Sequence, residues 1–296
     1  MRRPHLKMFS TLKRYCVKNF VSDRRFVEWQ YRSVYGHFPN LVKPRTFDEK
    51  IQWYKLYYRK PVMTRLADKY NVRQYVTQKK LGHILNELYG VYECAEEINF
   101  ETLPDTFVLK ATHGSGMNII CKNKRELDLE RCRLTLKGWL GGNYYDMGRE
   151  WAYKDIRPKI IYEKYIENEE RGELIDYKFY CYGGKPEVVF VCCGRFSPEG
   201  VKYDGYDMQW NRIPVYKGRP AAGLNLTKPG NFDEMFDIAT RLSGGFPFIR
   251  VDLYSVDNRI YFGELTFYPD NGVVSFSPDK YNYFFGDLFV LPEKTN

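Results

Sequence analysis

Residues 107–118 read FVLKATHGSGMN, an apolar run that carries Lys110 and leads into a loop rich in glycine and serine. The run predicts a β-strand, and a second short strand follows near Asn118. Glycines let backbone amides approach phosphate oxygens closely, and a lysine beside them adds positive charge. The GxxxxGK[ST] order of a P-loop is absent. The stretch therefore indicates a different kind of phosphate-binding hairpin, although a hairpin that binds no ligand would have the same pattern.

Residues 159–167 read KIIYEKYIE, an alternating strand pattern that ends in charged, aromatic and aliphatic residues. At the edge of a sheet, the backbone N–H and C=O groups of such a segment can hydrogen-bond an adenine ring. Its apolar side chains would then cover the faces of the ring. The segment is thus a candidate adenine site, and an ordinary edge strand with exposed charges is the alternative.

Two further runs predict a β-hairpin, FIRVDLY at residues 248–254 and YFGELT at residues 261–266. Because side chains alternate along a strand, Arg250 and Asp252 share one face of it. The short turn brings Glu264 onto the neighbouring strand. Buried carboxylates need partners, and Mg²⁺ that also binds nucleotide phosphates is a common one. A purely structural pair of arginine and aspartate is the alternative.

Strands outnumber helices in the middle of the sequence. Apolar or alternating runs predict strands at 106–111, 118–121, 159–166, 175–182, 187–193, 247–254 and 259–267. Helical patterns predict helices at 126–140 and 232–243. Two earlier helices are also predicted. The first follows the capping box Thr46–Glu49, and the second runs from about Asp68 to Lys80, with Gly82 as its C-terminal stop. Mostly antiparallel strands with helices interspersed indicate an α+β fold.

The net charge of +9 is concentrated at one end of the 296-residue chain. The first 25 residues carry Arg2, Arg3, Lys7, Lys13, Arg14, Lys18, Arg24 and Arg25 against Asp23 alone. That segment has a net charge of +7, which leaves +2 for the remainder. The body is nearly neutral, so the composition does not indicate a nucleic-acid-binding face, and we expect no nucleic-acid partner.

Residues 5–21 place apolar side chains at helical spacing and basic side chains elsewhere, which predicts a basic amphipathic helix. The helix can pack on the body, or it can contact the inner membrane surface. No run approaches the roughly 18 apolar residues of a membrane span, and no secretory signal is present. The seven cysteines form no CxxC pair, and we interpret them as reduced core thiols. We therefore expect a cytoplasmic protein.

The order of these stretches resembles the ATP-grasp superfamily, in which a nucleotide lies between two mostly antiparallel sheet subdomains. Within it the chain resembles the TupA-like branch, found among proteins of bacterial surface-polysaccharide and teichuronopeptide synthesis. The stretch RTFDEKIQW at residues 45–53 carries this resemblance, which extends over about residues 25–290. It implies an N-terminal basic helix and helical region at 1–100, a small subdomain with the phosphate loop and adenine hinge at 101–170, and a large subdomain with metal carboxylates at 171–296.

The resemblance also implies roles for individual residues. The nucleotide phosphates would be held by Lys69, Lys110 and a loop formed by His113, Gly114, Ser115, Gly116, Met117 and Asn118. Adenine would lie against Glu163, Lys164, Tyr165 and Ile166. The ribose would be bound by Asp176, and Lys178 would lie near the phosphates. Arg250 would face the phosphate that is transferred, and Asp252 and Glu264 would bind Mg²⁺.

One position departs from the family pattern. Many ATP-grasp enzymes have Glu-x-Asn after the last strand, with the asparagine as a metal ligand, whereas this chain has Thr266 at the third position. Asp270 or Asn271 from the following turn could complete the metal site, or water could.

The activity that the resemblance implies is amide formation. ATP would convert a substrate carboxylate to an acyl phosphate, and an amine would then attack the acyl carbon. For this branch the acid is expected to be a uronic acid of a bacterial surface polysaccharide, or a peptide growing on it, and the amine an amino acid or a similar compound. Two alternatives remain open, namely a kinase that phosphorylates a glycan hydroxyl, and a polysaccharide-assembly protein without turnover.

Overall fold

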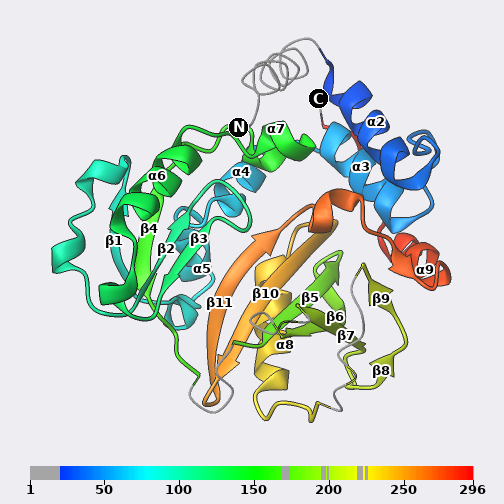
Figure 1. The fold of residues 1–296 in the computed structure, drawn as a ribbon. Helices are drawn as coiled ribbons and strands as arrows, with labels where there is room; N and C mark the ends of the chain where they lie inside the picture. The colour runs from blue at the N-terminus through cyan, green and yellow to red at the C-terminus, as the bar shows by residue number, and fades with distance from the viewer. Residues whose placement is uncertain are drawn as a thin grey trace.

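The computed structural model describes residues 21–168, 174–194, 198, 200–218, 223 and 226–295. The basic helix expected at residues 5–21 therefore lies almost entirely outside the described residues. Within them the chain forms a small sheet, a large sheet and a helical region that adjoins both (Figure 1). None of the helices in this described part is long and apolar enough to cross a membrane. The α+β class expected from the sequence is confirmed.

The small sheet has four strands in the order β1-β4-β2-β3, and every neighbouring pair is antiparallel. Its strands are β1 (Leu88–Tyr92), β2 (Phe107–Ala111), β3 (Asn118–Cys121) and β4 (Ile160–Lys164). Helix α6 (Leu129–Leu140) packs on this sheet, and its Leu136 joins a core with Phe107 and Leu109. The predicted strands at 106–111 and 118–121 are confirmed. The helix predicted at 126–140 begins later, because Asp128 caps α6 by accepting from the Arg131 N–H at 2.9 Å.

One interpretation of the small sheet is wrong. β4 lies between β1 and β2, so residues 159–167 do not form an edge strand. The second neighbour of β4 is β1, which the sequence patterns did not reveal and which precedes residue 101, the expected start of the small subdomain. Pairing between strands far apart in sequence leaves no local signal, so the central position of β4 could not be seen in its own residues. The expected domain bounds stay a prediction.

The large sheet has six strands in the order β11-β10-β5-β6-β7-β8. They are β5 (Asp176–Tyr182), β6 (Lys185–Cys193), β7 (Lys202–Tyr206), β8 (Arg212–Ile213), β10 (Phe248–Val256) and β11 (Arg259–Thr266). Helix α8 (Phe232–Ser243) packs against β5, β6 and β10. β10 and β11 are joined by the expected turn, in which Asp257 and Asn258 have positive φ angles of 50° and 59°. The hairpin prediction is confirmed.

Aromatic residues close one end of the large sheet on the face away from α8. Phe47 of helix α3 (Phe47–Tyr57) packs edge to face on Phe248 with ring centroids 5.1 Å apart. Phe276 of strand β12 (Phe276–Ser277) lies 5.3 Å from Phe47 and 6.1 Å from Tyr180. β12 pairs with β9 (Tyr216–Lys217). The polar part of the same sheet face therefore lies beyond this aromatic cluster, and the candidate functional side chains lie in that polar part.

The helical region contains α2 (Asp23–Tyr35), α3, α4 (Pro61–Ala67), α5 (Val72–Gln78) and α9 (Lys280–Leu288). The capping box at the start of α3 is confirmed, since Thr46 Oγ1 accepts from the Glu49 N–H at 3.3 Å and Glu49 Oε2 accepts from the Thr46 N–H at 3.2 Å.

Six described cysteines are free, and five of these are buried, as core thiols should be.

The helix expected from Asp68 to Lys80 is shorter than predicted. Asp68 Oδ1 accepts from the N–H groups of Tyr70 and Asn71, so the side chain forms a turn and α5 begins only at Val72. Lys80 adopts a left-handed φ of 57°, and Gly82 begins a separate 3₁₀ turn, η1 (Gly82–Ile84). The expected end at Gly82 is therefore wrong.

Candidate functional site

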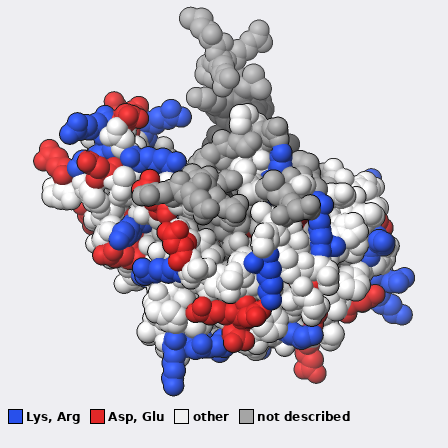
Figure 2. All heavy atoms as spheres, turned by 90° about the horizontal axis from the view of Figure 1, so that it is seen from below, with Lys and Arg blue, Asp and Glu red and all other residues white. Residues whose placement is uncertain are grey.

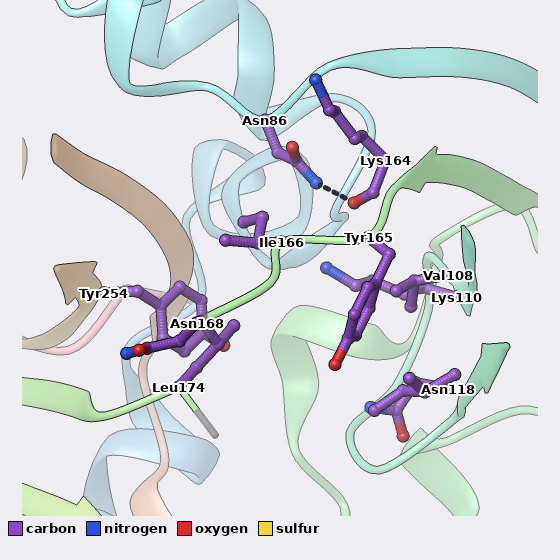
Figure 3. A pocket seen from close by; sticks show the side chains of 11 residues that line it. Asn86, Val108, Lys110, Asn118, Lys164, Tyr165, Ile166, Asn168, Leu174 and Tyr254 are labelled. Atoms are coloured by element: carbon purple, nitrogen blue, oxygen red, sulfur yellow. Dashed lines mark hydrogen bonds between the residues drawn. The ribbon is translucent and has the colours of Figure 1, made fainter. Parts of the chain in front are cut away.

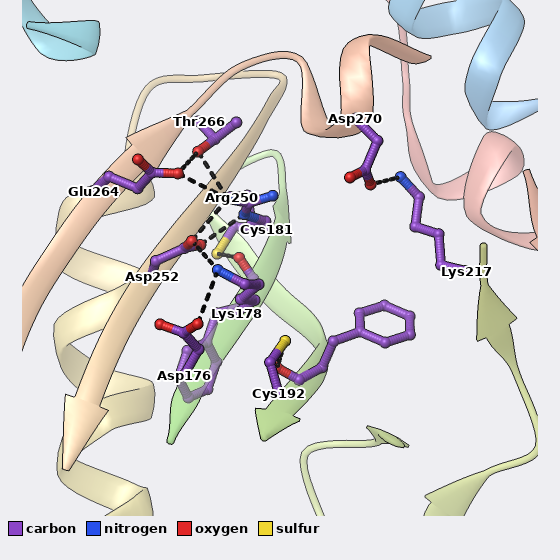
Figure 4. Close-up of polar contacts among 12 residues, drawn as sticks. Asp176, Lys178, Cys181, Cys192, Lys217, Arg250, Asp252, Glu264, Thr266 and Asp270 are labelled. Atoms are coloured by element: carbon purple, nitrogen blue, oxygen red, sulfur yellow. Dashed lines mark hydrogen bonds and ion pairs between the residues drawn. The ribbon is translucent and has the colours of Figure 1, made fainter. Parts of the chain in front are cut away.

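Charged side chains from three neighbouring strands of the large sheet form one network (Figure 4). Arg250 of β10 donates to both carboxylate oxygens of Asp252, at 2.6 and 2.7 Å, and to Glu264 of β11 at 2.9 Å. Lys178 of β5 donates to Asp252 at 2.5 Å and lies 3.8 Å from Asp176. The alternation predicted from the sequence places Arg250 and Asp252 on this face, and Glu264 joins them from β11.

A β-bulge aligns the two central carboxylates. Asp252 pairs directly with Glu264, but Leu253 pairs with Phe262, so Gly263 is an extra residue in β11. A Cβ atom at Gly263 would lie only 2.9 Å from the Asp252 carbonyl oxygen, so this position needs a glycine. The bulge keeps Glu264 on the same face as Asp252 and next to it.

The surrounding charges determine the protonation state of this network. Burial alone would raise the pKa of Glu264, but Lys69 and Arg250 outweigh it and lower that pKa to about 2. Burial likewise opposes the charged form of Lys178, yet Asp252 and Asp176 raise its pKa well above the usual range. Glu264 and Lys178 are therefore both charged at neutral pH.

This network forms one wall of a cavity of about 400 Å³ between the two sheets. The facing wall comes from the phosphate-loop candidate and from two lysines, Lys69 and Lys110. Residues of the cavity wall that the sequence had also singled out are Lys69, Lys110, Ser115, Gly116, Met117, Asn118, Asp176, Lys178, Arg250, Asp252 and Glu264. Segments far apart in the chain thus meet at one place with positive charge on one side and carboxylates on the other.

The two lysines are held in different ways. Lys69 donates its backbone N–H to the Thr112 carbonyl at 3.1 Å, and its Nζ donates to the Gly114 carbonyl at 2.6 Å and lies 3.6 Å from Glu264. Lys110 projects from β2 and donates to Glu163 of β4 at 2.7 Å. Lys69 therefore connects the loop to the large sheet, whereas Lys110 is oriented within the small sheet.

The loop between β2 and β3 has glycines where its shape requires them. Gly116 has a φ of 71°, a left-handed conformation that favours glycine. At Gly114 an added Cβ would meet Tyr144 at 2.9 Å and Met117 at 3.1 Å. The loop is thus packed closely against Tyr144 while Ser115, Gly116 and Asn118 border the cavity.

A second, smaller cavity of about 90 Å³ adjoins the first one where the chain leaves β4 (Figure 3). Its lining residues are Asn86, Val108, Lys110, Asn118, Ile120, Lys164, Tyr165, Ile166, Asn168, Leu174 and Tyr254. Asn86 donates to the Lys164 carbonyl at 2.8 Å, which orients this part of the backbone. Apolar side chains beside backbone amides and carbonyls make a slot with the properties that a purine ring requires.

Three predicted binding residues lie outside the walls of both cavities. His113 is 1% exposed, and its Nε2 is 2.9 Å from the Trp139 carbonyl. Glu163 is buried and forms ion pairs with Lys110 at 2.7 Å and Arg73 at 3.1 Å. Gly114 supplies the carbonyl that accepts from Lys69. Glu163 and Gly114 therefore each accept from a lysine that borders the larger cavity, whereas His113 contacts the backbone of α6.

Several residues of the larger cavity were not recognised in the sequence. They are Tyr144, Glu150, Tyr153, Tyr203 and Tyr268. Three of them come from the segment NYYDMGREWAY at residues 143–153, which forms α7 (Tyr145–Gly148) and the 3₁₀ turn η5 (Trp151–Tyr153). A high density of aromatic residues is its only sequence signal, and that signal also fits core packing.

The carboxylate pair is chemically suited to Mg²⁺, which proteins commonly hold through one or two carboxylates with phosphates and water as the other ligands. Among the described residues there is no group of three or more His, Cys, Asp or Glu arranged to hold a metal ion without such help. Asp270 accepts from Lys217 at 2.6 Å, and Asn271 Oδ1 accepts from Lys55 at 2.6 Å. Both line the cavity and are held by a lysine, just as Asp252 is held by Arg250 and Lys178, but they do not form an adjacent pair of carboxylates as Asp252 and Glu264 do. The residues present therefore fit a metal bound by Asp252, Glu264 and a nucleotide.

Two antiparallel sheets with a polar cavity between them, a glycine loop on one side and paired carboxylates on the other, define the ATP-grasp class. The chain matches the family described as TupA-like ATPgrasp over residues 49–290. It belongs to this family, as the sequence resemblance indicated. A comparison with curated proteins found no match.

Two ligases are among the solved structures to which part of the chain is similar. The D-alanine–D-alanine ligase of Bacillus anthracis complexed with ATP is 13% identical, with a TM-score of 0.40 over 68% of this chain and 54% of that one. The ATP-grasp ligase PsnB, complexed with a phosphomimetic precursor variant, Mg and ADP, is 11% identical, with a TM-score of 0.40 over 71% of this chain and 53% of that one. This chain thus spans about half the length of these structures.

Proposed function

We propose that the protein is an ATP-dependent ligase that joins a carboxylate to an amine through an acyl-phosphate intermediate. The observation that carries this proposal is the cavity in which Lys69, Lys110 and a glycine loop face Asp252 and Glu264. Cations and amides on one wall suit phosphate oxygens, and hard carboxylate oxygens on the other suit a divalent ion. The adjoining slot beside Tyr165 supports a nucleobase site next to the same cavity.

Each wall has a role in this proposal. Lys69, Lys110 and the backbone amides near Gly116 hold the β- and γ-phosphates, while the slot holds adenine and Asp176 holds the ribose. Arg250 and Lys178 face the phosphate that is transferred. Mg²⁺ bound at Asp252 and Glu264 would neutralise the phosphate charge.

The chemistry has two steps. A substrate carboxylate attacks the γ-phosphorus in line, which forms the acyl phosphate and releases ADP. The amine then attacks the acyl carbon, and phosphate leaves. The chain's contribution is chiefly orientation and charge stabilisation, because phosphoryl transfer of this kind needs little covalent help from the protein.

The family to which the chain belongs supports a proposal for the substrates. Its resemblance to proteins of bacterial surface-polysaccharide synthesis supports a uronic acid of such a glycan as the acid, and an amino acid or similar amine as its partner. We also propose that the reaction takes place in the cytoplasm, with peripheral contact to the inner membrane surface through the basic N-terminus.

Basic and acidic side chains are intermixed on the face shown in Figure 2, which agrees with the nearly neutral body of the sequence.

A matrix of uronic acids and amino acids, mixed with ATP and Mg²⁺, tests the proposal. The expected result is ADP, phosphate and an amide in equal amounts, with the product mass equal to acid plus amine minus water. Omission of the amine should leave only slow leakage to water. A product that gains the mass of one phosphate would make the protein a kinase, and no ADP with any pair would favour an assembly protein without turnover.

A further inference from the structure

Glu150 is a buried carboxylate in the wall of the larger cavity, and the proposed roles do not use it. It lies between α7 and η5, where Arg149 takes a left-handed φ of 53° and reverses the chain. Glu150 is only 5% exposed, yet it borders the cavity. Among the described residues, its carboxylate has neither a hydrogen bond nor an ion pair within 4 Å. A buried carboxyl group in such a position is either protonated or stabilised by a partner, and burial raises the pKa of Glu150.

The nearest cations are already committed to other acceptors. Lys55 of α3 has three N–H bonds, and they go to the Gly148 carbonyl at 3.2 Å, the Asn271 carbonyl at 2.9 Å and Asn271 Oδ1 at 2.6 Å. Arg250 donates to Asp252, Glu264 and Thr266. Lys55 and Arg250 therefore act on Glu150 through their electric field but give it no hydrogen-bond donor.

The groups around Glu150 favour a cation from solution. Burial raises the pKa of Glu150, Lys55 opposes this effect, and Asp270 and Glu264 add to it. Both of these carboxylates border the same cavity, as do Tyr144 and Tyr153, whose rings lie 4.9 Å apart. Negative charge beside aromatic rings attracts an ammonium group, because rings stabilise cations through their faces. A compact ammonium ion also supplies the N–H donors that Glu150 lacks.

We propose that Glu150 binds the ammonium group of the amine substrate and accepts a proton from it. This inference rests on the proposed ligase function and names the place of its second substrate. The ligand class is a primary aliphatic amine, such as the amino group of an amino acid. Glu150 would then be a catalytic residue, since it contacts the reacting nitrogen.

The step balances without any further reagent. The ammonium group transfers one proton to Glu150, and the freed lone pair of the nitrogen attacks the acyl carbon. A C–N bond forms and the C–O bond to the phosphate breaks. The second proton lost by the nitrogen leaves with the phosphate, and Glu150 returns its proton to water. The products are the amide, hydrogen phosphate and one proton.

Binding of a simple probe tests the inference without turnover. The full chain, saturated with Mg²⁺ and a non-hydrolysable ATP analogue, is titrated with ethylammonium chloride and, separately, with ethanol, and binding is followed by saturation-transfer NMR. Ethylammonium should bind and ethanol should not. Glu150→Gln should weaken ethylammonium binding roughly tenfold or more, because a hydrogen bond to a charged group is lost. The matched control is Glu130→Gln on the exposed side of α6, which should change nothing.

Hydroxylamine, which is neutral at pH 8, separates this inference from the ligase proposal. Glu150→Gln should still form acyl hydroxamate from ATP and the uronic acid, while kcat/KM for amide formation with the amine falls at least tenfold through both a higher KM and a lower kcat. Unchanged ethylammonium binding in the variant would overturn the inference and leave the ligase function intact. A changed Mg²⁺ dependence of nucleotide binding with unchanged ethylammonium binding would make Glu150 a metal ligand instead. Failure of the wild-type protein to form hydroxamate would overturn the ligase function itself.

Discussion

The two sheets provide opposite chemistry to the same cavity. The small sheet presents a lysine and a glycine loop, and its Lys110 is oriented by Glu163 from the neighbouring strand. The large sheet presents carboxylates, and its Asp252 is bound by Arg250 and Lys178 from its own strand and the next one. Each sheet therefore pairs charged side chains within itself, and Lys69, which lies on neither sheet, approaches Glu264 as well. A nucleotide with a metal ion would thus join two surfaces whose charged groups already have partners.

The largest expected effect comes from the carboxylates of the large sheet. Asp252→Asn and Glu264→Gln each remove a hard oxygen anion, so ADP formation should fall by at least about 100-fold, as it does when one preorganised electrostatic group is lost. Steady-state ADP release at saturating ATP measures this. The matched control is Asp233→Asn at an 89% exposed aspartate of α8, which should be neutral. Wild-type turnover in either cavity variant would mean that the pair is structural.

A smaller effect is expected from the small sheet. Lys110→Ala removes one cation from the phosphate wall, while Glu163 keeps Arg73 as its partner. ATP binding in calorimetry should weaken about tenfold, the equivalent of roughly 1.5 kcal/mol for a lost charged hydrogen bond. Lys185→Ala, at an exposed lysine of the β5–β6 hairpin, serves as the control. Nucleotide affinity equal to that of the wild-type protein would remove Lys110 from the phosphate site.

The large-sheet network also predicts a pH dependence of stability. Lys69 and Arg250, despite burial, lower the folded-state pKa of Glu264 from 4.5 to about 2. A depressed carboxylate pKa contributes stability above the unfolded pKa and loses it as pH falls through the folded pKa. The free energy of unfolding of wild type relative to Glu264→Gln should therefore be constant above about pH 5 and decrease between pH 4.5 and 2. Denaturant titrations at several pH values measure it, and a pH-independent difference would contradict the assigned charge network.

The smallest expected effect is at Thr266, where the chain departs from the Glu-x-Asn pattern. Its hydroxyl donates to Glu264 at 2.9 Å and accepts from Arg250 at 3.1 Å. Thr266→Val removes both bonds and should raise the Mg²⁺ concentration needed for half-maximal rate about two- to tenfold. Thr266→Asn should lower that concentration if the amide oxygen adds a metal ligand. An unaltered Mg²⁺ dependence in both variants would show that this position does not influence the metal site.

Local patterns predicted the parts of the site that lie on regular elements. Alternation along β10 was sufficient to place Arg250 and Asp252 on one face, because strand geometry fixes which side chains share a face. The turn at Asp257-Asn258 alone would set Gly263 opposite Asp252, so the pairing with Glu264 depends on the bulge. The bulge at Gly263 could also have been suspected from an isolated glycine inside a strand pattern. The class of fold followed from the order of these elements together with the family resemblance.

The remainder depends on long-range packing. Glu150 borders the cavity because η5 packs on α4 while Tyr144 packs on the phosphate loop at Gly114, and nothing in residues 143–153 specifies those contacts. β4 is central because β1 pairs with it from a distant part of the chain. The length of α5 was overestimated because the Asp68 side chain competes for backbone N–H groups that a longer helix would use.

Lys69 has a consequence for the thermodynamics of nucleotide binding. Its Nζ donates to the Gly114 carbonyl of the phosphate loop and lies close to Glu264 on the large sheet, so Lys69 connects the loop to that sheet. A nucleotide phosphate that binds Lys69 must compete with the Gly114 carbonyl and Glu264. The free energy of those two contacts therefore reduces the affinity for the nucleotide. Release of the contact between the phosphate loop and the large sheet should therefore favour nucleotide binding, and nucleotide binding should favour that release to the same extent, because the two equilibria share Lys69.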